Sequence, residues 1–190
     1  MRFLQGYKFW LLAALLLLAR PVFGQYYALP DGKDHTDRIH FQLINNLMVI
    51  PMEVNGASLN FILDSGVSKP ILFNISDQDS IELKEVSKIT IRGLGDGEPV
   101  DALRSLGNTF RINSLKNLNQ ELYVVLNKEM NFSSSLGIPV HGIIGYDLFR
   151  DFVVEINYNR GFIRFHDPET YDRKIRKDAV TLPLTVTHNK

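Results

Sequence analysis

One aspartate in this 190-residue chain stands where a side chain could do chemistry. The apolar run of residues 61–63 leads directly into Asp64, which is followed by the turn residues Ser65 and Gly66. An aspartate before a Ser-Gly turn is usually a turn residue that hydrogen-bonds its own backbone. A second carboxylate nearby would give it another role, because two carboxylates that share one proton can act as general acid and general base.

A second segment, about 80 residues later, has a complementary pattern. Two bulky aliphatic residues, Ile143 and Ile144, are followed by Gly145 and then by a predicted short helix over residues 146–151. A buried strand that ends in a glycine before a helix is common by itself. Its combination with an apolar-Asp-Ser-Gly turn in one chain is much less common, so the two segments are best interpreted together.

The two segments together resemble the signature pair of retropepsin-like aspartic peptidases. In that family a hydrophobic-hydrophobic-Asp-Thr/Ser-Gly loop is followed, late in the lobe, by a hydrophobic-hydrophobic-Gly strand that packs beneath it. The resemblance covers about residues 39–167 and is closest to exported bacterial members, in which two lobes and often a PDZ domain share one chain. It implies that Asp64 is catalytic, that Ser65 and Gly66 support the catalytic loop, and that Ile143, Ile144 and Gly145 pack under it.

A glycine-rich stretch between the two segments falls where the family has its flap, a hairpin that closes over the substrate. The resemblance therefore implies a flap and substrate-binding role for these residues. A phosphate-binding loop is the other interpretation, but the stretch lacks the following Lys-Ser/Thr and the strand-to-helix context of such sites. The stretch consists of Gly93, Leu94, Gly95, Asp96 and Gly97.

The resemblance also implies a peptide or protein substrate, hydrolysis by an activated water, and no cofactor. No metal site is expected, because the five histidines show no ligand spacing. The sequence holds no second apolar-Asp-Thr/Ser-Gly segment besides that of Asp64. Its partner carboxylate must therefore come from a second retropepsin-like lobe, either a homodimer mate or a C-terminal half. We expect the isolated monomeric lobe to be inactive.

Two other kinds of protein fit the same residues. The lobe could be a non-catalytic module that binds peptides or only dimerises, because the second carboxylate lies outside the sequence. An unrelated β-barrel could also carry Asp-Ser-Gly by chance, and a structure that separates Asp64 from residues 143–145 would select that interpretation. A nucleophilic serine is not favoured, since no Gly-x-Ser-x-Gly elbow surrounds Ser65 or Ser68.

Composition and charge are those of an ordinary globular protein, with 45% hydrophobic and 22% charged residues. The net charge of zero gives no electrostatic reason to expect nucleic acid as a partner. Cysteine is absent, which excludes disulfides and thiolate metal sites. Stability must therefore come from a hydrophobic core.

The N-terminal residues differ in kind from the rest of the chain. Arg2 and Lys8 flank the start, an apolar run covers residues 9–19, and small residues precede Gln25, which together form a signal-peptide pattern. The run is too short to span about 30 Å of hydrocarbon. We therefore expect an exported, periplasmic or extracellular bacterial protein with no stable membrane span after cleavage. The expected division is a signal peptide (1–24), a loose N-terminal lead-in (25–38), a peptidase lobe (39–168), and a connector with the truncated start of a possible second lobe (169–190).

The elements that must position these residues are mostly strands. Short runs with β-type alternation, separated by Gly and Asn turns, predict an all-β fold. With the resemblance, this gives a single retropepsin-like closed β-barrel lobe with a flap hairpin and one short helix over residues 146–151. A short acidic segment at residues 76–83 also has helical character. Strands are predicted at residues 39–44, 47–54, 59–63, 71–73, 88–91, 109–112, 122–126, 152–156 and 162–165.

Overall fold

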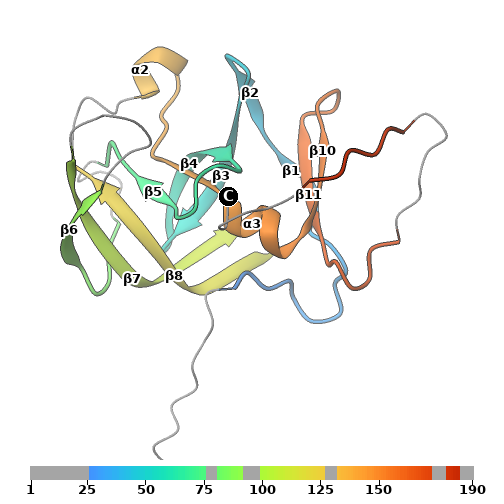
Figure 1. Cartoon of the computed structure of the whole chain (residues 1–190), viewed down its shortest axis with the longest axis horizontal. Helices are drawn as coiled ribbons and strands as arrows, with labels where there is room; N and C mark the ends of the chain where they lie inside the picture. Colours follow the sequence, from blue (N-terminus) through green and yellow to red (C-terminus); the bar gives the residue numbers. More distant parts are fainter. Residues whose placement is uncertain (1–25, 76–80, 92–98, 127–131, 173–178, 185–190) are drawn as a thin grey trace, which may run out of the picture.

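The computed structural model describes residues 26–75, 81–91, 99–126, 132–172 and 179–184 (Figure 1). The predicted signal peptide and the predicted flap residues 93–97 lie outside these ranges. The described chain consists mainly of β-strands, with two short helices. Its elements are β1 (Ile39–His40), β2 (Gln42–Ile44), β3 (Leu47–Val54), β4 (Ala57–Asp64), β5 (Ile71–Leu72), β6 (Ser87–Ile91), β7 (Val100–Ile112), β8 (Leu115–Val125), α2 (Phe132–Leu136), β9 (Gly142–Gly145), α3 (Tyr146–Asp151), β10 (Val153–Asn157) and β11 (Phe162–His166).

Six of these strands form a closed barrel in the order β3-β4-β9-β5-β8-β7 (Figure 1). The barrel closes because β3 pairs with β4 on one edge and, at Glu53 and Val54, with β7 on the other. β2 and β6 extend beyond the ring by pairing with the remaining parts of β3 and β7. A sheet that closes on itself leaves few edges exposed. The predicted all-β closed barrel is confirmed.

The turn of the β3–β4 hairpin also helps to close the barrel. Asn55 and Gly56 have positive φ angles of 50° and 90°, which a two-residue hairpin turn requires and an Asn-Gly pair adopts at low cost. The Asn55 side chain accepts a hydrogen bond from the Thr109 amide and donates one to Asn108 Oδ1, both at 2.8 Å. Because both partners belong to β7, the turn is fastened to the strand that completes the ring.

Alternation along the strands sorts the buried apolar side chains into two clusters. The larger cluster fills the barrel and includes fully buried residues such as Phe61, Phe110 and Ile144. The smaller cluster lies on the other face of the sheet and includes Leu136, which α2 contributes. Both faces of the central strands are therefore covered in part. The smaller cluster consists of Val49, Ile62, Phe73, Leu136 and Val140.

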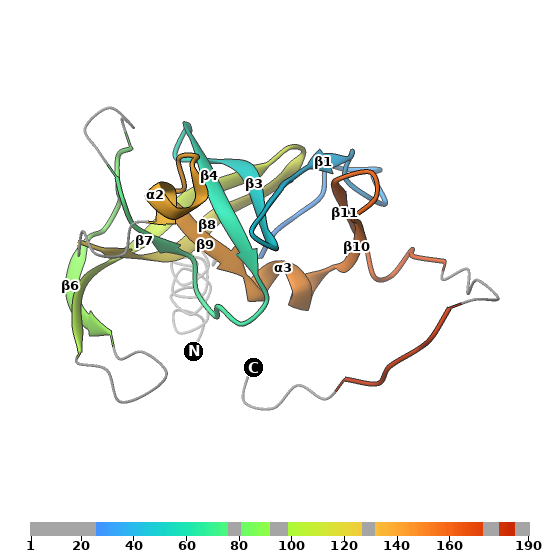
Figure 2. The same ribbon diagram turned by 90° about the horizontal axis from the view of Figure 1, so that it is seen from above.

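A second sheet, in the order β1-β11-β10, stands beside the barrel. Seen from above, α3 lies between the barrel and this small sheet (Figure 2). The lead-in, predicted at residues 25–38, is attached to both sheets near its two ends: Ala28 forms a bridge with Lys116 of β8, and the Thr36 amide donates to the Phe165 carbonyl of β11, while residues 30–35 between them are exposed. These hydrogen bonds satisfy backbone groups of both sheets and hold the two ends of the segment in place.

Several elements differ from the sequence expectation. β7 and β8 are longer than the predicted runs at residues 109–112 and 122–126, because polar residues continue both strands beyond their apolar parts. The described part of the predicted 76–83 helix, residues 81–83, is irregular, whereas α2 was not predicted. Residues 179–184 are exposed and belong to no strand. In the described ranges, no helix is long and apolar enough to cross a membrane.

Tyr27 places a polar hydroxyl group in the apolar core. The side chain is 5% exposed, and the hydroxyl has no hydrogen-bond partner among the described residues. Burial, and then the charges of Asp147 and Asp151, raise the pKa of this hydroxyl. A buried hydroxyl without a partner costs free energy, so Tyr27→Phe should raise the free energy of unfolding by about 1 kcal/mol. Urea denaturation measures this, with the exposed Tyr158→Phe as the control; a loss of stability in Tyr27→Phe would contradict it.

Candidate active site

Asp64 is the last residue of β4, and its side chain is exposed. Phe61 and Leu63 belong to the barrel core, so the alternation of the strand turns Asp64 toward the opposite face of the sheet. The chain then makes a tight turn, in which the Gly66 amide donates to Asp64 Oδ1 at 2.9 Å and the Val67 amide donates to the Asp64 carbonyl at 3.2 Å. The turn therefore holds a solvent-accessible carboxylate in a defined place. Ser65 is exposed in the same turn.

β9 lies between β4 and β5, the two strands that flank this turn. It is parallel to β4, which places Gly145 beside Asp64, and antiparallel to β5, which places Ile143 beside Ile71. A Cβ atom on Gly145 would lie 1.9 Å from the Asp64 carbonyl oxygen, a contact that no backbone can accommodate without moving. Only glycine allows the strand to approach the aspartate this closely.

Gly142 has the same role at the other end of β9. A Cβ atom there would lie 2.5 Å from the Ile71 carbonyl oxygen and 2.5 Å from the ring of Phe61. Beyond β9, the first residue of α3 also contacts the turn, because the Tyr146 amide donates to the Val67 carbonyl at 3.1 Å. The turn that carries the aspartate is thus fixed by β9 below it and by the start of α3 beside it.

The surface next to Asp64 is apolar on the side of β9 and β5. Ile62 of β4 pairs with Ile143 of β9, which pairs with Ile71 of β5, so these side chains form a row on the face that carries Asp64. Ile71 and Ile143 are only partly buried and pack against the smaller apolar cluster. Ile62 itself is buried, so Ile71 and Ile143 are the members of the row that can contact a molecule lying across the carboxylate.

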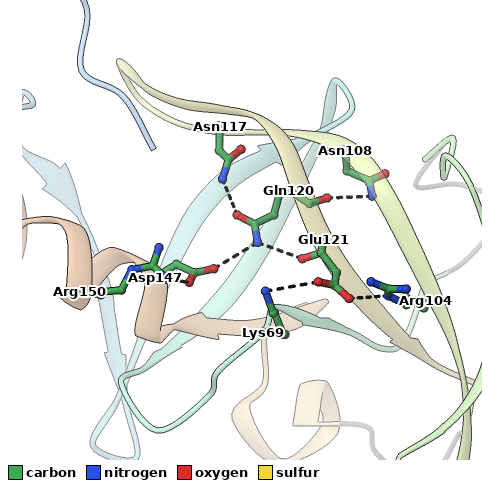
Figure 3. A network of polar contacts seen from close by, with 8 residues as sticks. All are labelled: Lys69, Arg104, Asn108, Asn117, Gln120, Glu121, Asp147 and Arg150. Atoms are coloured by element: carbon green, nitrogen blue, oxygen red, sulfur yellow. Dashed lines mark hydrogen bonds and ion pairs between the residues drawn. The ribbon is translucent and has the colours of Figure 1, made fainter. Parts of the chain in front are cut away.

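An ion cluster continues this surface beyond β5 (Figure 3). Lys69, at the end of the Asp64 loop, lies 3.3 Å from Glu121 of β8, and Arg104 of β7 lies 2.5 Å from the same carboxylate. The Glu121 side chain is 9% exposed, whereas those of Lys69 and Arg104 are 31% and 42% exposed. Burial opposes ionisation of Glu121, but the two cations outweigh it and lower the pKa of the carboxyl.

A second set of polar contacts fastens α3 to β8 (Figure 3). Gln120 is fully buried; its Nε2 donates to Asp147 Oδ2 at 3.2 Å, and its Oε1 accepts from Asn117 at 2.7 Å. Arg150 pairs with the other oxygen of Asp147 at 3.0 Å. These contacts satisfy a buried amide and a buried carboxylate at once. They also hold the helix whose first amide contacts the Asp64 turn.

The structure thus brings Ser65, Gly66 and residues 143–145 together around Asp64. This proximity argues against a barrel that carries Asp-Ser-Gly by chance. The flap residues 93–97 lie outside the described residues, but β6 and β7, which they connect, pair from Ile91 and Val100 onward. In the described part of the chain, no three potential metal ligands converge.

Sequence reasoning missed the ion cluster of Lys69, Arg104 and Glu121. The three residues are separated by 17 to 52 positions, and each has ordinary neighbours in the sequence. Only the register of β5, β8 and β7 brings them together. No local pattern in the sequence could have identified them.

Comparison with known proteins identifies the family of this chain. The sequence model described as "Aspartyl protease" matches residues 50–148, more than half of the chain, and the chain therefore belongs to the aspartyl protease family. Among solved structures, the chain is similar to a retropepsin-like aspartic protease from Rickettsia conorii, with 15% identity and a TM-score of 0.49 over 77% of this chain and 97% of the other. A search of curated protein sequences returned no match.

Replacement of Gly145 tests the close packing beneath Asp64. Gly145→Ala should lower the free energy of unfolding by about 3 kcal/mol or more, because the added methyl overlaps backbone atoms that cannot move aside. Gly161→Ala is the control: its φ of 61° is strained for alanine, but the nearest atom is 3.7 Å away, so the cost should be about 1 kcal/mol. Thermal and urea denaturation compare the two. Equal losses would show that β9 is not in close contact with the Asp64 turn.

Replacement of Glu121 tests the ion cluster through its pH dependence. The pKa of Glu121 is below its usual 4.5, so the cluster stabilises the fold above that pH and the contribution disappears as the pH falls through the folded-state pKa. Glu121→Gln should therefore lower the free energy of unfolding by about 1–2 kcal/mol at pH 7 and by less below pH 4.5. Glu53→Gln, which removes the exposed pair with Arg111, should cost less. A deficit for Glu121→Gln that is independent of pH would refute this account.

Proposed function

We propose that this chain is one lobe of an exported aspartic endopeptidase, with Asp64 as its contribution to the catalytic pair. One observation carries the proposal: in a chain of the aspartyl protease family, an exposed carboxylate is held by the Gly66 amide directly beside Gly145. An exposed carboxylate with a fixed orientation is suited to meet a second one at the seam between two lobes. The reaction proposed is hydrolysis of a peptide bond by an activated water.

The chemistry follows from the pairing of two aspartates. Like charges about 3 Å apart cannot both be ionised easily, so the pair shares one proton. The ionised aspartate takes a proton from water as it attacks the peptide carbonyl, and the protonated aspartate gives its proton to the leaving nitrogen. The pair titrates as a unit, so neither role belongs permanently to Asp64. The Gly66 amide donates a hydrogen bond to Asp64 Oδ1 and so fixes the orientation of the carboxylate.

The second aspartate comes from another lobe in this proposal. The sequence contains no second apolar-Asp-Thr/Ser-Gly segment, so the facing group belongs either to a second copy related by two-fold symmetry or to a C-terminal half. The exposure of Asp64 supports both arrangements equally. The signal-peptide pattern of residues 1–24 supports action in the periplasm or outside the cell.

An extended peptide is the substrate that the surface around Asp64 suits best. Ile143 and Ile71, which are partly exposed, provide apolar contacts beside the carboxylate. A peptide strand on this face would place alternate side chains against the lobe, and its backbone would be held by hydrogen bonds. The segment of residues 93–97, which connects β6 and β7, is the proposed flap over the peptide.

Replacement of Asp64 tests the proposed function. Asp64→Asn should lower kcat/KM of the full-length protein on a peptide library by at least about 1,000-fold, because an amide cannot share the proton or act as a base. Asparagine has nearly the same shape as aspartate, and the side chain is exposed. The circular dichroism spectrum and the thermal midpoint should therefore stay as in the wild type. Mass spectrometry of the library identifies the cleaved bonds.

Asp31→Asn is the matched control, because Asp31 is also an exposed aspartate before a glycine-containing turn but follows no apolar strand. It should leave the cleavage rate unchanged. Activity that survives Asp64→Asn would disprove the proposed function. Peptide binding without any cleavage, in protein of any assembly state, would favour the non-catalytic binding module instead.

A further inference from the structure

The strand registers place the ion cluster of Lys69, Arg104 and Glu121 on the same face of the sheet as Asp64. Ile62 pairs with Ile143 and Ile143 with Ile71, and the row then continues to β8 and β7. Directly paired residues on neighbouring strands project from the same face. The guanidinium of Arg104 therefore belongs to the face that carries the catalytic candidate. The complete row is Ile62, Ile143, Ile71, Tyr123 and Arg104.

A neighbouring row passes through Asp64 itself. Asp64 pairs with Gly145. On the next two strands, Ile71 of β5 pairs with Tyr123 of β8, and Lys69 and Glu121 each lie two positions before these paired residues. The hydrogen bond from the Tyr123 amide to the Pro70 carbonyl, at 2.9 Å, holds the two segments together here. Glu121 is thus three strands away from Asp64. Strands are spaced by about 4.8 Å, so the path along the curved barrel wall is about 14 Å and the straight distance is shorter. An extended peptide covers this distance in about four residues or fewer.

Arg104 has hydrogen-bond donors that the cluster does not use. Lys69 and Arg104 both contact the carboxylate of Glu121. Arg104 uses its Nε for this contact, and within the described residues its two terminal amino groups have no further partner. Its side chain is 42% exposed, so the remaining donors are accessible to another molecule. A guanidinium held in one orientation by a carboxylate is well suited to bind a second carboxylate.

We propose that Arg104, oriented by Glu121 and supported by the charge of Lys69, selects substrates with an aspartate or glutamate about three to four residues from the scissile bond. The inference rests on the proposed function and names its substrate class. The apolar row next to Asp64 binds the side chains nearest to the cleaved bond, and the cluster binds the acidic side chain farther along the peptide. The alternative is that the cluster only stabilises the fold and makes no contact with the substrate.

Cleavage of matched peptides by the full-length protein tests the inference. Peptides are compared in pairs, one pair for each position within four residues of the cleaved bond. The two peptides of a pair differ only in carrying Glu or Gln at that position. At one position, kcat/KM should be about 5- to 30-fold higher for the Glu peptide, and Arg104→Gln should reduce this ratio to about one. The preference should weaken at 0.5 M salt, because the cluster is partly exposed. Arg160→Gln, which changes an exposed arginine of the β10–β11 turn, should keep the wild-type ratio.

Binding separates a failure of this inference from a failure of the proposed function. Fluorescence anisotropy with the Asp64→Asn protein measures the affinity for the same two labelled peptides without any hydrolysis. The Glu peptide should bind several-fold more tightly, and Arg104→Gln in this background should equalise the two. Equal affinity for both peptides, or a preference that Arg104→Gln leaves unchanged, overturns the inference even if cleavage depends on Asp64.

The remaining outcomes also decide between the two ideas. A preference for the Glu peptide in binding, together with no cleavage by the wild type, would support the acidic specificity of this surface and reject the peptidase function. No binding of either peptide would overturn the inference. A change in the thermal midpoint of Arg104→Gln with an unchanged Glu-to-Gln ratio would assign Arg104 a structural role only.

Discussion

The central constraint in this structure is the insertion of β9 between the two strands that flank the Asp64 turn. The insertion is possible only because Gly145 and Gly142 have no side chain, since a Cβ at either position would overlap backbone atoms of Asp64 or Ile71. In return, β9 fixes the end of β4 from one side, and α3, which follows directly, fixes the turn from another. The exposed carboxylate therefore rests on one of the most tightly packed parts of the barrel.

The polar groups around this centre are arranged to support the same turn. Gln120 and Asp147 are buried, and their contact holds α3 against β8. Lys69, at the end of the turn, forms an ion pair with Glu121, which also belongs to β8. Lys69 follows Asp64 closely in the sequence, whereas α3 contacts the Asp64 turn through the hydrogen bond from the Tyr146 amide to the Val67 carbonyl. The proposed function depends on the packing of β4 against β9, and the proposed acidic specificity depends on the neighbouring wall formed by β5, β8 and β7.

The parts of the fold that the sequence could predict are those that depend on local pattern. Residues 47–54 alternate and end at Asn55-Gly56, so β3 and its turn were predictable, as was α3 after Gly145. The lengths of β7 and β8, the attachment of Ala28 and Thr36 to the two sheets, and the helix α2 depend on contacts between distant segments. The proximity of Asp64 to Gly145 was predictable only through the family resemblance, and the cluster around Glu121 was not predictable, because it requires the register of three strands.

The most direct test of the central claim is the binding of a statine-type inhibitor, which mimics the tetrahedral intermediate, to the full-length protein. Isothermal titration calorimetry should give micromolar or tighter binding to the wild type and at least about 100-fold weaker binding to Asp64→Asn, because the inhibitor hydroxyl occupies the place of the water between two aspartates. One inhibitor should bind per pair of lobes. No binding to the wild type, or equal binding to both proteins, would contradict a catalytic pair that contains Asp64.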